Sequence, residues 1–145
     1  MLAVALTRWR CCEAEPGDLA LVRDSWRRSY RDSPGTVKWP DAAYDAWISA
    51  RQATLLPLCR VSVARHESSP DGVIGWLATQ QQPGRYIAHY AWVAKPFRGE
   101  GVLRSLVNHQ QPYGELVIST LRPPFSDAFQ HLGFRFDPKA SHSKR

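Results

Sequence analysis

The sequence predicts an α+β domain in which helices flank a central, mixed and mostly antiparallel sheet. Three observations support this fold class. Residues 58–64 alternate apolar and polar side chains, as expected of a half-buried strand. Residues 19–30 repeat apolar side chains at the spacing of a helix with one buried face. Residues 90–107 combine an apolar strand, a loop with two glycines and an apolar helix, so that the elements follow the order β-α-α-β-β-β-α-β-α-β.

The first third of the chain predicts one strand and two helices. Residues 2–10 alternate loosely and predict the strand. Asp18 is a suitable N-cap for a helix that runs to Tyr30, because a short polar side chain can accept a bond from the first free amides. A second helix is expected over residues 41–56, since Pro57 cannot continue it. The residues predicted to face the core are Leu19, Val22, Trp26, Tyr30, Tyr44, Trp47 and Ile48.

The later elements are separated by residue types that favour tight turns. Residues 69–72 (Ser-Pro-Asp-Gly) and 82–84 (Gln-Pro-Gly) are predicted turns between three strands. The strands are expected over residues 58–64, 73–79, 86–93, 115–120 and 133–136, and the helices over 102–108 and 124–132.

Length and composition predict one ordinary domain. A chain of 145 residues with 43% hydrophobic and 22% charged side chains can bury a single core. We expect residues 1–137 to form it and the basic residues 138–145 to be a mobile tail. No apolar run suits a membrane span or a signal peptide, so a cytoplasmic protein is expected. Cys11, Cys12 and Cys59 lack metal-site spacing, which predicts reduced thiols and no metal.

The net charge of +6 is spread over the whole chain. Residues 1–65 hold ten basic against seven acidic side chains, and residues 66–145 hold nine against six. One denser run recurs at helical spacing and consists of Arg23, Arg27, Arg28 and Arg31. It is either a solvated helix face or a patch that attracts an anionic substrate or nucleic acid.

Residues 98–103, Arg-Gly-Glu-Gly-Val-Leu, connect a predicted strand to a predicted helix. The first amides of a helix have no partner within it and lie at the positive end of its dipole. Glycine lets a ligand come close to such amides, because no Cβ intervenes. The loop therefore predicts an anion site, most usefully for a phosphate.

This loop resembles the Arg/Gln-x-x-Gly-x-Gly/Ala loop of the GCN5-related N-acetyltransferases (GNAT superfamily). Residues 129–134, Phe-Gln-His-Leu-Gly-Phe, are similar to the Tyr-x-x-x-Gly-Phe ending of that family, and the order of elements matches over residues 3–137. Residues 24–34 and 89–101 also resemble small GNAT-like proteins carried by bacteriophages.

The resemblance implies a GNAT-like fold and transfer of an acetyl group from acetyl-CoA to a primary amine by direct attack in a ternary complex. It implies that the fourth and fifth strands separate beside a bulge and hold the pantetheine arm between them. Two departures are visible: Leu103 replaces a small residue of the loop, and Phe129 replaces a tyrosine that often serves as general acid. The implied cofactor-binding residues are Trp92, Val93, Arg98, Gly99, Glu100, Gly101, Val102 and Leu103.

Catalytic and acceptor residues are less clearly indicated. His89 is a candidate base, on the face of Val93 by the strand period of two, or else a histidine satisfied within the sheet. Ser119 and Thr120 are candidates to protonate the coenzyme thiolate. The candidates to meet the acceptor amine are Asp24, Tyr30 and Asp32, with Asp45 as a further carboxylate; each acid is alternatively a cap or a surface charge.

Two other functions stay open at this stage. Leu103 and Phe129 are changes that a non-catalytic GNAT-like binding module would also show. The basic helix face allows a protein that modifies nucleic acid. The partners expected are a small-molecule or protein amine and no membrane, and the chain is either a monomer or a homodimer.

Overall fold

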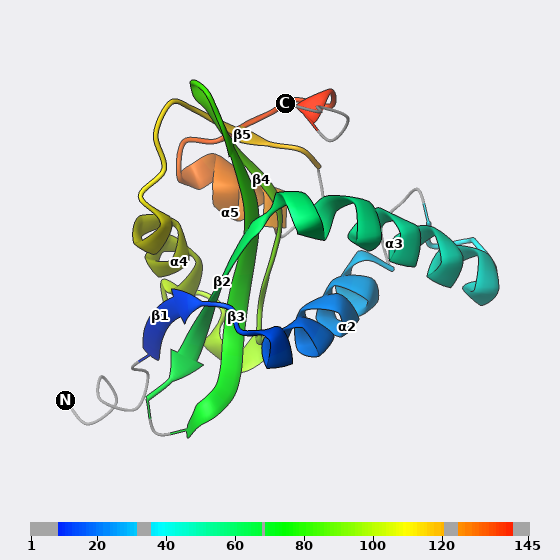
Figure 1. The fold of residues 1–145 in the computed structure, drawn as a ribbon, viewed down its shortest axis with the longest axis horizontal. Coiled ribbons are helices and arrows are strands. Elements are labelled where there is room, and N and C mark those ends of the chain that lie inside the picture. The colour runs from blue at the N-terminus through cyan, green and yellow to red at the C-terminus, as the bar shows by residue number, and fades with distance from the viewer. Residues whose placement is uncertain (1–8, 32–35, 68, 121–124, 141–145) are drawn as a thin grey trace.

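A six-stranded mixed sheet forms the centre of the structure, a computed structural model that describes residues 9–31, 36–67, 69–120 and 125–140 (Figure 1). The strands follow one another in chain order across the sheet: β1 (Trp9–Glu13), β2 (Arg60–His66), β3 (Ser69–Gln82), β4 (Arg85–Val93), β5 (Glu115–Ile118) and β6 (Arg135–Phe136). Strands β1 to β4 pair antiparallel, whereas β4–β5 and β5–β6 pair parallel. The predicted fold class and order of elements are confirmed.

Helices cover both faces of the sheet. Helices α2 (Leu19–Tyr30) and α3 (Asp41–Leu55) pack on one face, and α4 (Val102–Gln110) and α5 (Phe125–His131) on the other (Figure 1). Short 3-10 turns are η1 (Pro16–Asp18), η2 (Leu56–Leu58) and η3 (Lys95–Phe97). The apolar faces predicted for the first two helices point to the core, since Val22, Trp26, Tyr44 and Ile48 are buried. Trp76 and Tyr90 meet them from the sheet, and Leu77 and Ala88 face α4 and α5.

The start of the chain differs in detail from the prediction. Strand β1 begins at Trp9 and continues to Glu13, and residues 1–8 of the predicted strand lie outside the described residues. Asp18 is the N-cap residue of α2, as predicted, but its side chain makes no capping hydrogen bond to that helix. Its carboxylate instead accepts the Glu15 N–H at 2.7 Å and pairs with Arg65, which closes the turn of η1. The polar side chain thus caps the turn before the helix.

Strand β3 is longer than predicted and begins at Ser69 rather than after the predicted turn at 69–72. His66 pairs with Ser69, and Arg65 pairs with Val73. Residues 70–72 of the Ser-Pro-Asp-Gly pattern therefore form an irregularity within β3 that has no partner in β2, rather than the predicted turn between strands. The turn predicted at 82–84 is confirmed, with Gln82 paired to Arg85.

The end of the described chain is packed on the sheet. Ala140 is fully buried against Ile87 and Val117, and Arg85 pairs with Asp137 at 3.0 Å. Ala140, within the predicted mobile tail 138–145, thus packs on the sheet in this structure. Residues 141–145 lie outside the described residues.

Candidate active site

The loop between β4 and α4 has the form that the sequence predicts. Gly99 has φ +80° and Gly101 has φ +96°, in the left-handed region that favours glycine. Gly101 is the N-cap of α4 and supplies no side chain to cap it. The first helical bond joins the Ser105 N–H to the Gly101 carbonyl at 3.0 Å. The amides of residues 101–104 consequently have no partner within the helix.

The space into which a side chain at the two loop glycines would point is open. A Cβ placed on Gly99 or Gly101 would meet no atom within 4 Å. Packing therefore does not require glycine at either position, and only the positive φ does. An anion can approach the amides directly and would gain from the helix dipole.

The side chains of the loop leave this space free. Arg98 Nε donates to the Val93 carbonyl at 2.9 Å, which holds the guanidinium between the end of β4 and the loop. Leu103 is half-buried and packs against the core under α4, so its bulk does not fill the loop. The departure from a small residue at this position is thereby accommodated by the core.

Strands β4 and β5 separate after four residue pairs. They pair from Arg85 to Ala88, and the Ser119 N–H donates to the Ala88 carbonyl at 3.2 Å. Beyond this point β4 has no neighbour on its β5 side within the residues that the structure describes. We call the opening between the two strands the fork.

The backbone groups that face the fork follow from the antiparallel ladder. The Ala94 N–H donates to the Ile74 carbonyl at 2.8 Å, and Trp92 is paired with Trp76 in the same register. Because bonded positions alternate along such a ladder, Trp92 directs its N–H and C=O to β3, whereas Val93 directs them into the fork. Of the two predicted backbone contacts, the geometry supports Val93 alone.

His89 lies in a β-bulge at the base of the fork. Ala78 pairs with Tyr90 and Thr79 with Ala88, so that His89 is an extra residue in β4. The bulge turns His89 to the α2–α3 face, whereas Val93 packs toward α4. The prediction that His89 and Val93 share a face is wrong, because the extra residue shifts the period of two.

The imidazole of His89 is buried and fully hydrogen bonded. It is 3% exposed, with Nδ1 at 2.9 Å from Ser119 Oγ and Nε2 at 3.0 Å from Gln80 Oε1. The amide oxygen of Gln80 can only accept, so Nε2 carries the proton and Nδ1 accepts from the Ser119 hydroxyl. Burial, aided by the positive charge of Arg51, lowers the pKa of His89 to about 4. The ring is therefore neutral at neutral pH.

We expect this histidine to make folding stability depend on pH. Between about pH 4 and 6.5 the unfolded chain binds a proton that the folded chain excludes. The free energy of unfolding therefore decreases as the pH is lowered through that window. The free energy of unfolding should drop by about 2 kcal/mol between about pH 7.5 and 5. Urea denaturation at a series of pH values measures this free energy of unfolding. His89→Gln should remove this slope, and an unchanged slope in the variant would contradict the assignment.

The other hydroxyl predicted to donate a proton and the aromatic residue at position 129 are placed differently. Thr120 follows Ser119 and is half-buried. Phe129 is fully buried and meets Phe134 edge to face, with ring centroids 4.9 Å apart. Phe129 therefore packs in the hydrophobic core. Ser119 is the residue whose hydroxyl is hydrogen bonded to His89.

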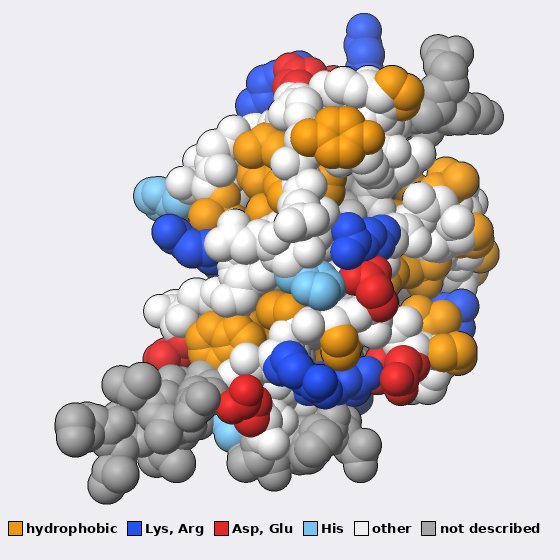
Figure 2. Space-filling model, turned by 60° about the vertical axis from the view of Figure 1, so that its left-hand side comes forward, with side chains coloured by type: hydrophobic (Ala, Val, Ile, Leu, Met, Phe, Trp, Pro, Cys, Tyr) orange, Lys and Arg blue, Asp and Glu red, His pale blue; other side chains and the backbone are white. Residues whose placement is uncertain are grey.

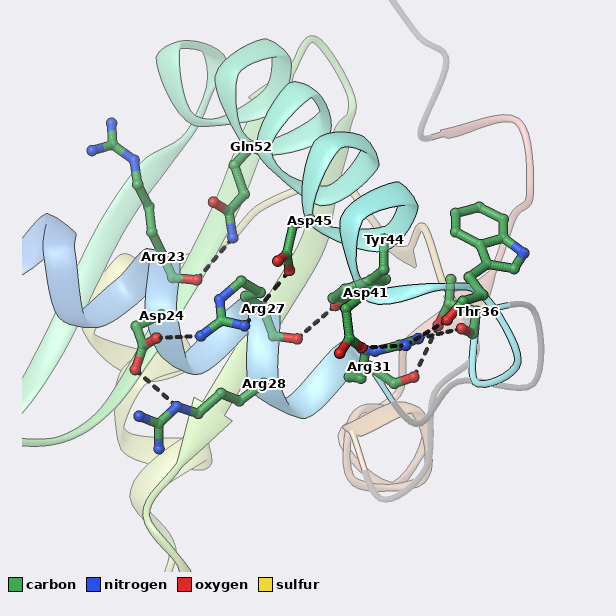
Figure 3. Close-up of polar contacts among 11 residues, drawn as sticks. Arg23, Asp24, Arg27, Arg28, Arg31, Thr36, Asp41, Tyr44, Asp45 and Gln52 are labelled. Atoms are coloured by element: carbon green, nitrogen blue, oxygen red, sulfur yellow. Dashed lines mark hydrogen bonds and ion pairs between the residues drawn. The ribbon is translucent and has the colours of Figure 1, made fainter.

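The acidic candidates on α2 and α3 are each paired with arginine (Figure 3). Asp24 contacts Arg27 at 2.9 Å and Arg28 at 3.0 Å, and Asp45 contacts Arg27 at 3.7 Å. Asp32 lies outside the described residues. Tyr30 is half-buried against aromatic rings. The alternative of surface charges therefore describes Asp24 and Asp45 better than a site for a cationic amine.

Sequence reasoning missed Gln80 and Arg51. Gln80 lies near the end of a strand whose predicted range stopped at Thr79, and Arg51 is one of many helix arginines. Only the bulge brings His89 to both of them, and no sequence pattern here indicates the bulge.

On the face seen in Figure 2, basic side chains lie beside acidic ones, and the run of basic side chains at lower centre has acidic side chains on either side. Glu13 illustrates the pairing, with Arg60 at 2.9 Å and His109 at 2.8 Å. In the described ranges no helix has the length and apolar character to cross a bilayer, and no cluster of His, Cys, Asp and Glu could hold a metal ion.

Comparison with known proteins shows which solved structures share this fold. Neither a protein-family model nor a curated protein sequence matches the chain. Among solved structures, a candidate acetyl transferase from Pyrococcus furiosus has TM-score 0.62 and 15% identity over 87% of this chain and 92% of its own. The histone acetyltransferase HPA2-related protein of Corynebacterium glutamicum has TM-score 0.59 and 16% identity over 86% and 83%.

A third structure carries a ligand. The PaiA N-acetyltransferase from Thermoplasma acidophilum, in complex with coenzyme A, has TM-score 0.51 and 11% identity over 72% of this chain and 70% of its own. Identities this low establish the fold and leave the activity to the site itself. The chain has the GNAT acetyltransferase fold that its sequence predicts.

Proposed function

We propose that the chain is an acyl-CoA-dependent N-acyltransferase that transfers acetyl from acetyl-CoA to a primary amine by direct attack in a ternary complex. The observation that carries the proposal is the combination of open amides at α4 with a fork that begins beside them. An anion site and a gap in a sheet, joined by one strand, suit a ligand with a diphosphate at one end and a long amide-bearing arm.

The residues present fit this coenzyme. The amides of residues 101–104 would hold the diphosphate, and Arg98 would add charge from the end of β4. The Val93 N–H would pair with a carbonyl of the arm, since a backbone N–H at an open strand edge needs a partner, whereas the Val93 carbonyl already accepts from Arg98. The bound coenzyme supplies an activated acyl thioester. An N–H directed into the fork is also placed to stabilise the oxyanion that forms at its carbonyl.

Ser119 and His89 form a proton carrier at the base of the fork. The Ser119 hydroxyl donates to His89 Nδ1, so it can pass its proton to the ring while accepting one from the attacking amine. With a pKa of about 4 the ring is a weak base and its imidazolium a strong acid, so it would hold the proton only briefly and return it through the Ser119 hydroxyl to the departing thiolate. Such a carrier needs no tyrosine at position 129. Thr120, directly after Ser119, is a second candidate donor.

Titration calorimetry with acetyl-CoA, followed by an assay of free thiol with an amine panel, tests the proposal. We expect saturable binding in the micromolar range and thiol release that depends on the amine. Binding without any release would favour the non-catalytic module, for which the buried and fully bonded His89 is the supporting observation. No binding at millimolar acetyl-CoA would refute both.

A further inference from the structure

The two sides of the fork are built differently, and the difference bears on the acceptor. Helix α4 and its open amides lie on one side, and the bulge turns His89 to the other, under α2 and α3. If the coenzyme enters from α4, as the proposed function requires, the amine must arrive from the α2–α3 side. The side chains there should match its chemistry.

Four aromatic residues, Tyr30, Trp39, Trp47 and Tyr90, form a continuous set on that side, which we call the aromatic wall. Tyr90 directly follows His89 and meets Tyr30 edge-on, with ring centroids 5.8 Å apart. Tyr30 stacks on Trp47 at 5.6 Å, and Trp47 meets the edge of Trp39, also at 5.6 Å. Trp39 is 37% exposed, so the wall leads from the base of the fork to solvent.

The wall carries positive and no free negative charge in the described part of the chain. Asp24 and Asp45 are paired as described, and Asp41 accepts from Arg31 at 3.0 Å (Figure 3). Arg31 is also committed, because it donates to the carbonyls of Thr36 and Trp39. A cationic acceptor would thus find these three carboxylates already paired with arginine.

Arg51 is the exception among these cations. It is half-buried on α3, its guanidinium lies 5.7 Å from the ring centre of Trp47, and within the described ranges no carboxylate contacts it. Its charge also helps to lower the pKa of His89. A half-buried guanidinium without an anion is well suited to bind a carboxylate through two parallel hydrogen bonds.

We infer that the acceptor is an amine that also carries a carboxylate and an aromatic side chain, with Arg51 binding the carboxylate and the exposed edge of the aromatic wall contacting the ring. This inference rests on the proposed function. Polyamines and aminoglycosides are disfavoured acceptors, because a polycation would approach Arg51 and Arg31 without meeting a free carboxylate among the residues that the structure describes.

The pair tryptophan and tryptamine tests this, because the two amines differ only in the carboxylate. Rates of thiol release are compared at equal concentrations of the neutral amine. We expect kcat/KM to be about 10-fold or more higher for tryptophan, and Arg51→Gln to reduce that ratio to about 2-fold or less. A ratio near one in the wild type, or faster reaction with tryptamine or spermidine, would overturn the inference.

Arg23→Gln is the matched control. It makes the same change of charge on α2, about two turns before Tyr30, where Arg23 lines a separate groove beside Glu15 and Leu19. It should keep the preference for tryptophan, and a loss equal to that in Arg51→Gln would reduce the effect to overall charge and overturn the role of Arg51.

Coenzyme calorimetry on the same samples separates this inference from the proposed function. If acetyl-CoA binds and tryptamine is preferred, the inference fails and the function stands. For a protein that binds coenzyme but turns over neither amine, saturation-transfer NMR with N-acetyltryptophan and N-acetyltryptamine gives the second readout. Selective binding of the carboxylate form, lost in Arg51→Gln, would support the inference, and equal or absent binding would refute it.

Discussion

Gly101→Glu is expected to raise the Kd for acetyl-CoA by about 100-fold or more while the domain stays folded. The new side chain would occupy the open space over the α4 amides, and its carboxylate would lie against the diphosphate. Two like charges about 4 Å apart near a protein surface repel by about 4 kcal/mol, which exceeds the loss needed. Folding is less affected, because a carboxylate at a helix N-terminus is favourable and only the φ of +96° is strained.

Gly133→Glu provides the matched control for this substitution. Gly133 has φ +94°, and a Cβ there also meets nothing within 4 Å, so backbone strain and added charge are the same. Its neighbour Phe134 contacts Tyr86 near the opposite end of β4 from the loop. Calorimetry should show normal affinity in this control. Equal affinities in the two variants would exclude the α4 amides as the diphosphate site.

The fold was accessible from the sequence because each element has a local signal. Alternation over residues 58–64 and the stripe from Leu19 to Tyr30 arise from burial on one face, and burial is what selects those residue types. The two glycines of the loop signal positive φ, and both adopt it. The sequence predicted an element correctly wherever the conformation favoured by its own residues is also the one that packs in the fold.

The site was less accessible because its geometry depends on long-range pairing. The bulge at His89 is a mismatch between β3 and β4, so neither strand shows it alone. The pairing of Asp24 with Arg28 and the early start of β3 likewise depend on which neighbours compete for the same groups. Cytoplasmic location, a bacteriophage origin and the choice between monomer and homodimer stay predictions from the sequence.

The fork also depends on a glycine that no motif singled out. Gly114 precedes β5, and the Glu115 N–H donates to the Gly84 carbonyl at 2.8 Å, which joins the start of β5 to the β3–β4 turn. A Cβ on Gly114 would lie 2.5 Å from both the carbonyl carbon and oxygen of Gly84 and 2.9 Å from the Arg85 nitrogen. These are backbone atoms, so the clash can be relieved only by moving one chain away from the other.

Gly114→Ala is therefore expected to lower the free energy of unfolding by about 3 kcal/mol or more, measured by urea denaturation. The φ of +84° accounts for about 1–2 kcal/mol of this, and the clash for the rest. Gly84→Ala isolates the first contribution, because its φ is +74° and its Cβ meets nothing within 4 Å. If both variants lost the same stability, close contact at Gly114 would not be what fixes β5 beside β4, and the geometry of the fork would need another cause.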